Sequence, residues 1–110
     1  MDLEKGLIVA IAIQGEGINI GPKEFALNPF GPTHYRIEEE GNAPIGEWVF
    51  DAFNDYGKVS LGIHTHDSQG KRAEIIALEG LVAGAEGCHE VSLLKDGKSI
   101  PLKVAIQIKE

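Results

Sequence analysis

The chain has 110 residues, of which 43% are hydrophobic and 25% are charged. These proportions are typical of one folded domain, here residues 1–110, and they exclude a disordered or collagen-like chain. A formal net charge of −7 repels phosphate backbones and anionic lipid surfaces, so the chain is expected to bind neither nucleic acid nor membrane.

The first predicted element is the apolar run at residues 7–13. It predicts a strand that is covered on both faces, with its bulky side chains at the odd-numbered positions. Seven residues are too few to cross a bilayer, and no cleavage pattern follows them, so neither a signal peptide nor a transmembrane segment is expected. The single cysteine cannot form an internal disulfide. Cytoplasmic residence is therefore the default expectation.

Short segments between glycines and prolines form the middle of the chain. Residues 34–38 alternate as a half-exposed strand does, residues 48–53 are rich in aromatic side chains, and residues 59–63 alternate with period two. Residues 72–79 are ambiguous because alanine, glutamate and leucine favour a helix, whereas Gly80, Gly84 and Gly87 would interrupt it. We expect a strand there, with a short helix near 71–80 as the alternative.

The last segment is the clearest, because apolar residues alternate with other residues from 100 to 109. The Asp96-Gly97 pair just before it favours a two-residue hairpin turn. That turn would place Lys95 opposite Lys98 and fix the register of the two strands. Three further pairs follow from it, namely Leu93 with Ile100, Val91 with Leu102, and His89 with Val104. Pro101 is expected near the start of its strand or at an edge.

Roughly 7–9 short strands joined by glycine-rich connections predict an all-β fold. We expect a single small antiparallel β-sandwich with a jelly-roll or Ig-like topology. The alternative is a small β-barrel with one short helix near 71–80.

The stretch His64-Thr65-His66-Asp67 is the first candidate site. Residues two apart on a strand point to the same side, with Cα atoms about 6.5–7 Å apart, so the two imidazoles can share one metal ion. The carboxylate of Asp67 would add an oxygen ligand. The pair lies on the opposite side of its strand from Val59, Leu61 and Ile63, so two solvated histidines are the alternative interpretation.

This stretch also resembles the first motif of the cupin family, in which a His-x-His pair precedes a glutamate and an apolar strand that ends in a Leu-Glu-Gly-like turn. The corresponding residues here are His64, His66, Glu74 and the run 75–80. The resemblance implies a small β-barrel in which the two histidines and the glutamate hold a divalent transition metal. His34 is a possible further ligand. No other cofactor is predicted.

Other patterns have plainer interpretations. Cys88 and His89 are neighbours and face opposite ways on a strand, which favours a partly buried thiol and a histidine at the margin of the core. Gly15-Glu16-Gly17 is expected to be a simple turn, and Glu38-Glu39-Glu40 a solvated strand end. The aromatic residues of the first half could line a ligand pocket or an interface, or simply pack the core. They are Phe25, Phe30, Tyr35, Trp48, Phe50, Phe53 and Tyr56, of which Tyr35, Trp48, Phe50 and Phe53 are the favoured candidates.

Two functions remain open from these residues. The favoured one is a non-catalytic β-sandwich module that acts in ligand or protein binding or in self-assembly, as a homo-oligomer, with an unknown protein or small molecule as its other partner. The alternative is a cupin-like metal-binding barrel that uses the His64/His66 pair with Glu74 or Asp67.

Overall fold

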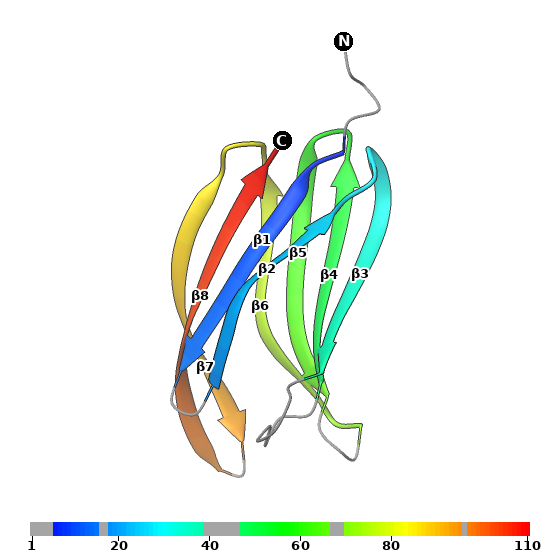
Figure 1. The fold of residues 1–110 in the computed structure, drawn as a ribbon. Helices are drawn as coiled ribbons and strands as arrows, with labels where there is room; N and C mark the ends of the chain where they lie inside the picture. Colours follow the sequence, from blue (N-terminus) through cyan, green and yellow to red (C-terminus); the bar gives the residue numbers. More distant parts are fainter. Residues whose placement is uncertain (1–5, 16–17, 39–46, 67–69, 96) are drawn as a thin grey trace.

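Two four-stranded antiparallel sheets pack face to face in the computed structural model of the chain (Figure 1). The structure describes residues 6–15, 18–38, 47–66, 70–95 and 97–110. The strands are β1 (Ile8–Gly15), β2 (Ile18–Ala26), β3 (Phe30–Glu38), β4 (Glu47–Asp55), β5 (Lys58–His66), β6 (Arg72–Leu81), β7 (Glu86–Lys95) and β8 (Lys98–Lys109). The predicted all-β sandwich is confirmed.

The strand order follows the chain. Sheet A has the order β2-β1-β8-β7, and sheet B has the order β3-β4-β5-β6. Each strand is therefore next in sequence to one that it pairs with, the chain crosses between the sheets after β2 and after β6, and β1 pairs with β8 in the centre of sheet A. This is an up-and-down order. The jelly-roll and Ig-like topologies, which are built on Greek-key connections, do not describe it.

The core lies between the sheets and is built by alternation along the strands. Val9, Ile11 and Ile13 of β1 are fully buried, as the odd-numbered positions were predicted to be. Ile8 and the alanines between them lie on the outer face of sheet A and are half-buried. The prediction that this strand is covered on both faces is therefore wrong within the described chain. Pairing with strands on both sides, rather than a second layer, accounts for its apolar sequence.

The hairpin of β7 and β8 has the predicted register. Lys95 pairs with Lys98, Leu93 with Ile100, Val91 with Leu102, and His89 with Val104. Asp96 lies outside the described residues, and Gly97 has a positive φ of 76°. β8 is a central strand, but its pairing with β1 ends at Leu102, so Pro101 lies where β8 pairs with β7 alone. The proline is therefore placed where one side of the strand pairs with none of the described strands.

Residues 72–81 form a strand, and the alternative helix is not present. Pairing with β5 outweighs the local helix preference of alanine, glutamate and leucine. The register of this pairing shifts twice, once between Val59 and Leu61 and once between Ile63 and His64. In the described part of the chain, no helix is long and apolar enough to cross a membrane.

Candidate functional site

The outer face of sheet B carries most of the polar side chains singled out by the sequence. Along β5, Val59, Leu61 and Ile63 point into the core, so Ser60, Gly62, His64 and His66 point outward. The pairing with β4 and β6 brings Asp51 and Glu74 to the same face. The alternation of apolar residues in the sequence thus predicted the correct side of β5 for His64 and His66.

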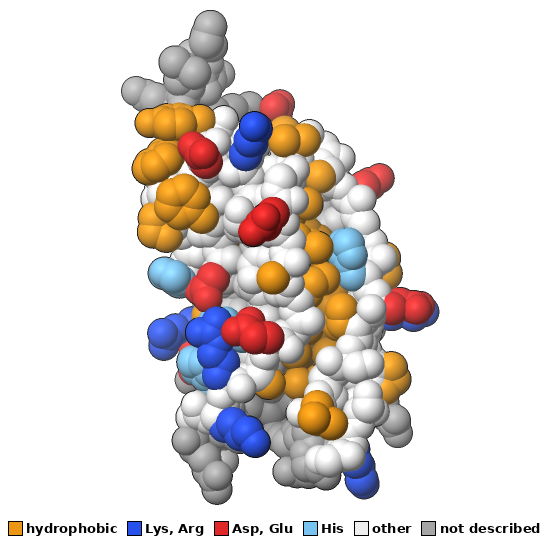
Figure 2. Space-filling model, turned by 180° about the vertical axis from the view of Figure 1, so that it is seen from behind, with side chains coloured by type: hydrophobic (Ala, Val, Ile, Leu, Met, Phe, Trp, Pro, Cys, Tyr) orange, Lys and Arg blue, Asp and Glu red, His pale blue; other side chains and the backbone are white. Residues whose placement is uncertain are grey.

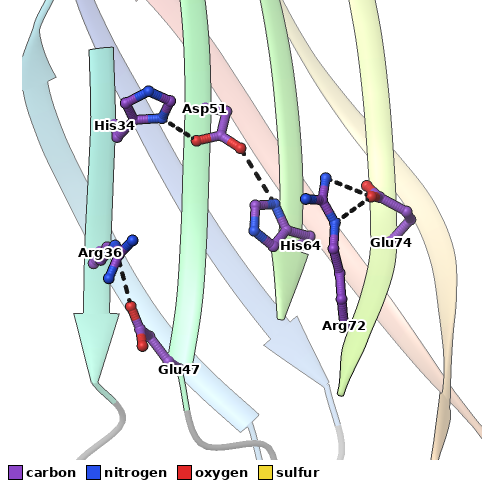
Figure 3. A network of polar contacts seen from close by, with 7 residues as sticks. All are labelled: His34, Arg36, Glu47, Asp51, His64, Arg72 and Glu74. Carbon is purple, nitrogen blue, oxygen red and sulfur yellow. Dashed lines mark hydrogen bonds and ion pairs between the residues drawn. The ribbon is translucent and has the colours of Figure 1, made fainter. Parts of the chain in front are cut away.

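Asp51 lies between two histidines from the strands on either side of it (Figure 3). Its Oδ1 is hydrogen-bonded to Nδ1 of His34, the residue directly opposite it on β3. Its Oδ2 lies 3.4 Å from Nδ1 of His64 on β5. The residue directly opposite Asp51 on β5 is Gly62, which has no side chain to separate the carboxylate from His64. This arrangement can orient both imidazoles, because each has one nitrogen directed at the same carboxylate.

Two ion pairs lie beside the His34, Asp51 and His64 side chains on the same face (Figure 3). Nη2 and Nε of Arg72 both lie 2.6 Å from Oε1 of Glu74. Arg36 Nε lies 3.4 Å from Glu47 Oε1 on the neighbouring strand. Most of these side chains are partly or largely exposed, so each pair contributes little stability by itself.

His64 is the buried member of the network, with 5% of its side chain exposed. Burial lowers its pKa below the ordinary value of 6.5, and the positive charge of Arg72 lowers it further. The Asp51 carboxylate raises the pKa but does not offset these effects. His64 is therefore a neutral imidazole at neutral pH.

This pKa predicts that the fold loses stability on mild acidification. The unfolded chain takes up a proton on His64 near pH 6.5, whereas the folded chain takes it up only at lower pH. Between these values the unfolded state binds more protons, so the free energy of unfolding falls as the pH drops below 6.5. Urea unfolding at about pH 7.5 and about pH 5.5 measures the change. His64→Gln should reduce the difference between the two conditions, and a wild-type chain that is more stable at the lower pH would contradict the assignment.

The predicted metal ligands are only partly brought together. The imidazole rings of His64 and His66 are 4.9 Å apart, and Glu74 lies opposite His64 on β6, but Glu74 is paired with Arg72. Asp67 lies outside the described residues. Within residues 6–15, 18–38, 47–66, 70–95 and 97–110, no group of three or more His, Cys, Asp or Glu side chains is arranged to hold a metal ion. Metal binding stays a prediction, which elemental analysis of tag-free protein would test.

The four predicted aromatic residues lie in two different environments. Trp48 and Phe50 are fully buried in the core, and Tyr35 is half-buried and packs against it. These three therefore belong to the packing between the sheets. Phe53 points outward and is 41% exposed.

Phe53 is one of three aromatic residues in contact at one end of the outer face of sheet B. Its ring meets that of Phe30 edge to face at 5.3 Å, and Phe30 stacks on Tyr56 at 4.9 Å. Phe30 is 51% exposed and Tyr56 is 79% exposed. We call these three residues the aromatic triad. Figure 2 shows hydrophobic side chains gathered at this corner of the molecule, at the upper left of the view.

Tyr56 occupies an unfavourable backbone conformation. It forms with Gly57 the two-residue turn between β4 and β5, and both residues have positive φ, 47° and 103°. Asn-Gly is the usual choice for such a turn, because a larger side chain at the first position is strained. Asn54 fastens the turn: its Oδ1 accepts a hydrogen bond from the Gly57 N–H, and its Nδ2 donates one to the Asn28 carbonyl.

The remaining sequence candidates lie elsewhere. Cys88 is exposed on the outer face of sheet A, so the expectation of a partly buried thiol is wrong, because no layer formed by the described residues covers that face. His89 is half-buried at the margin of the core. Glu16, Gly17, Glu39 and Glu40 lie outside the described residues. A shallow groove of about 530 Å³ crosses the outer face of sheet A, with Ala10, Ala12 and Ala105 among its lining.

Phe30 and Tyr56 belong to the aromatic group that the sequence offers for a pocket or an interface, but not to its favoured members. Sequence reasoning missed Asp51, Arg72 and the buried Asn54. The first two become neighbours of His64 only through strand pairing. Tyr56-Gly57, between two apolar segments, was the one local signal for a hairpin turn with an exposed aromatic residue. No protein-family model, curated protein or solved structure matches the chain.

Proposed function

We propose that the protein is a non-catalytic binding module that holds a protein partner on the outer face of sheet B, with the aromatic triad as its anchor. The observation that carries the proposal is the exposure of Tyr56 in a strained turn, stacked on a second exposed ring.

Exposed aromatic clusters are characteristic of protein interfaces. Scattered apolar side chains are common on any surface, but rings in mutual contact form a continuous apolar patch, and such patches mark interaction sites. Aromatic residues are also enriched among those that contribute most to binding energy. Phe30, Phe53 and Tyr56 come from β3, β4 and the turn after β4, and their contacts hold the rings in place before a partner binds.

Backbone strain supports the same interpretation. A tyrosine in the left-handed region costs about 1–2 kcal/mol relative to a residue that adopts it readily. Asn or Gly at position 56 would relieve this strain. The tyrosine side chain therefore serves a role other than the stability of the fold. Binding through an exposed ring is the role that the position allows, because 79% of the residue is accessible.

The polar groups beside the triad fit the rim of an interface. Asp55 and Lys58 flank it, and His34 and Asp51 continue the face towards His64. An interface typically has an apolar centre and a polar, solvent-accessible rim. Charged groups of both signs favour a protein partner with a complementary pattern over a uniformly charged ligand.

Photo-crosslinking tests the proposal. A benzophenone side chain placed at position 56 in cells that express the protein should give one discrete adduct with another protein. The same group at Val82, which is 50% exposed in the connection after β6, serves as the matched control and should not give that adduct. Phe30→Ser should abolish the adduct at position 56.

The partner identified in this way is then purified and titrated with the protein. Tyr56→Ser is expected to raise the dissociation constant about tenfold to a hundredfold, as the loss of an interface anchor does. Val82→Ser should leave it unchanged. The proposal is refuted if no discrete adduct forms at position 56, if Phe30→Ser leaves the adduct intact, or if the adduct is a second copy of the chain.

A further inference from the structure

Both sheets have two edge strands, and three of these four edges carry a feature that blocks the addition of another strand. β2 contains Pro22, and its register with β1 shifts between Ile11 and Ile13. β3 contains Pro32. The register of β6 with β5 shifts at two places. Prolines and irregular registers are devices by which proteins protect the edges of their sheets.

β7 has none of these features. It pairs with β8 through ten consecutive residues, Glu86–Lys95, without a shift in register and without a proline. None of the described backbone hydrogen bonds joins it to a strand other than β8. β6 runs close to β7 near the connection between them, and Figure 1 shows the two strands separating towards the other end of β7. A long, regular and unpaired edge is a template for pairing with another chain.

Away from the connection to β6, the side chains of β7 also lack a neighbouring strand on this side within the described chain. His89 and Val91 point into the sandwich but are only half-buried, because sheet A ends beside them. Leu94, on the outer face near the end of the strand, is 71% exposed. An added strand would cover these side chains as well as the unpaired backbone groups.

We propose that the protein forms a homodimer in which β7 pairs antiparallel with β7 of a second copy, joining the two A sheets into one of eight strands. This inference goes beyond the proposed binding function, because it concerns the opposite sheet. The partner strand comes from a second copy of the chain because β7 can pair with its own copy about a two-fold axis in one register that brings compatible side chains opposite each other.

That register places Val91 on the axis. Residues that face each other across an antiparallel pair must point to the same side of the sheet, so the axis can only pass through a residue, not between two residues. With Val91 on the axis, Val91 faces its own copy, Leu93 faces His89, Ser92 faces Glu90, and Leu94 faces Cys88. Each apolar side chain then meets an apolar side chain, the His89 imidazole or the Cys88 thiol, no two like charges face each other, and Leu94 is covered.

Neighbouring registers are less favourable. An axis through Glu90 would place two glutamates opposite each other, and an axis through Cys88 would pair Glu86 with Glu90. Like charges directly opposite each other destabilise a strand pair. An axis through Ser92 would place Leu94 against Glu90. An axis through His89 would pair residues 86–92 and leave Leu94 uncovered, and an axis through Leu93 would pair only residues 91–95 and set Val91 against Lys95. The register centred on Val91 avoids all of these arrangements and buries Leu94.

Light scattering coupled to size exclusion gives the first test. Tag-free protein should elute with twice the 11.8 kDa mass of the chain and dissociate on dilution. Leu94→Lys combined with Cys88→Lys places like charges opposite each other twice in the dimer, and should raise its dissociation constant about tenfold or more. Leu94→Glu combined with Cys88→Lys makes the same pairs attractive and should restore the dimer. All three substitutions are at exposed positions, so the monomer fold is kept, which circular dichroism verifies.

Disulfide trapping tests the register. Val91→Cys in a Cys88→Ser background places two thiols opposite each other across the axis, at a Cα separation of about 4.5–5.5 Å that suits a disulfide. Mild oxidation should give a covalent dimer on a non-reducing gel. Thr33→Cys in the same background, at a half-buried position on the β3 edge, is the matched control and should stay monomeric.

Three results would overturn the inference. The first is a strict monomer at all concentrations, and the second is a dimer that the double lysine variant does not weaken. The third is a disulfide between the Cys88 residues of two unsubstituted chains, which in the proposed register lie about 20 Å apart along the strands.

Discussion

Replacing Phe50 by alanine is expected to lower the free energy of unfolding by about 3–5 kcal/mol. The Phe50 ring is fully buried and lies 6.2 Å from the rings of both Phe25 and Tyr35. Phe25 belongs to β2 and Tyr35 to β3, and their rings stack at 5.1 Å. The three rings therefore join sheet A to sheet B where the chain first crosses between them. Removing Phe50 opens a cavity at this contact.

Urea unfolding followed by circular dichroism measures this loss. Phe53→Ala is the matched control, because Phe53 lies on the same strand but faces outward and is 41% exposed. It should change the stability by only about 0.5 kcal/mol. Equal losses in the two variants would show that the rings of Phe50, Phe25 and Tyr35 do not hold the sheets together.

Asn54→Ala is expected to cost about 2–3 kcal/mol. Asn54 is 1% exposed, its Nδ2 donates to the Asn28 carbonyl at 2.7 Å, and its Oδ1 accepts from the Gly57 N–H at 2.8 Å. Alanine leaves both backbone groups without this partner. The chain before β3 and the turn after β4 would then no longer be tied together.

The two hydrogen bonds of Asn54 can be separated by experiment. Asn54→Asp keeps the acceptor for Gly57 but loses the donor to Asn28, so its stability in urea should be below that of the wild type. Asn19→Ala removes an exposed asparagine of β2 and should change the stability by only about 0.5 kcal/mol. An Asn54→Ala loss as small as that of Asn19→Ala would contradict a structural role for these bonds.

The sequence predicts well what is determined by neighbouring residues. The β7–β8 register follows from one two-residue turn and the alternation on either side of it, and the structure has the same pairs. The outward direction of His64 follows from the alternation along β5 alone. Residues 72–81 were ambiguous because their local preference is for a helix, whereas the strand depends on pairing with β5, which a local pattern does not contain.

The candidate site depends on contacts between distant segments. Asp51 meets His34 and His64 only because β4 pairs with β3 on one side and β5 on the other, each in one particular register. A shift by two residues in either pairing would keep every side chain on its face and still separate the carboxylate from one imidazole. The aromatic triad is likewise assembled from residues 30, 53 and 56, which the sequence offers only as three members of a larger group of aromatic residues.

The pairing of β1 with β8 has a consequence for how the molecule folds. Sheet B consists of four strands that follow one another in the chain, so each of its pairings closes a short loop. Ile8 pairs with Lys109 and Gly15 with Leu102, so the centre of sheet A requires residues 87 to 101 positions apart to meet. Long-range pairings of this kind slow folding. Sheet B is therefore expected to form first. During synthesis, the apolar residues of β1 are expected to stay uncovered until β8 has been made.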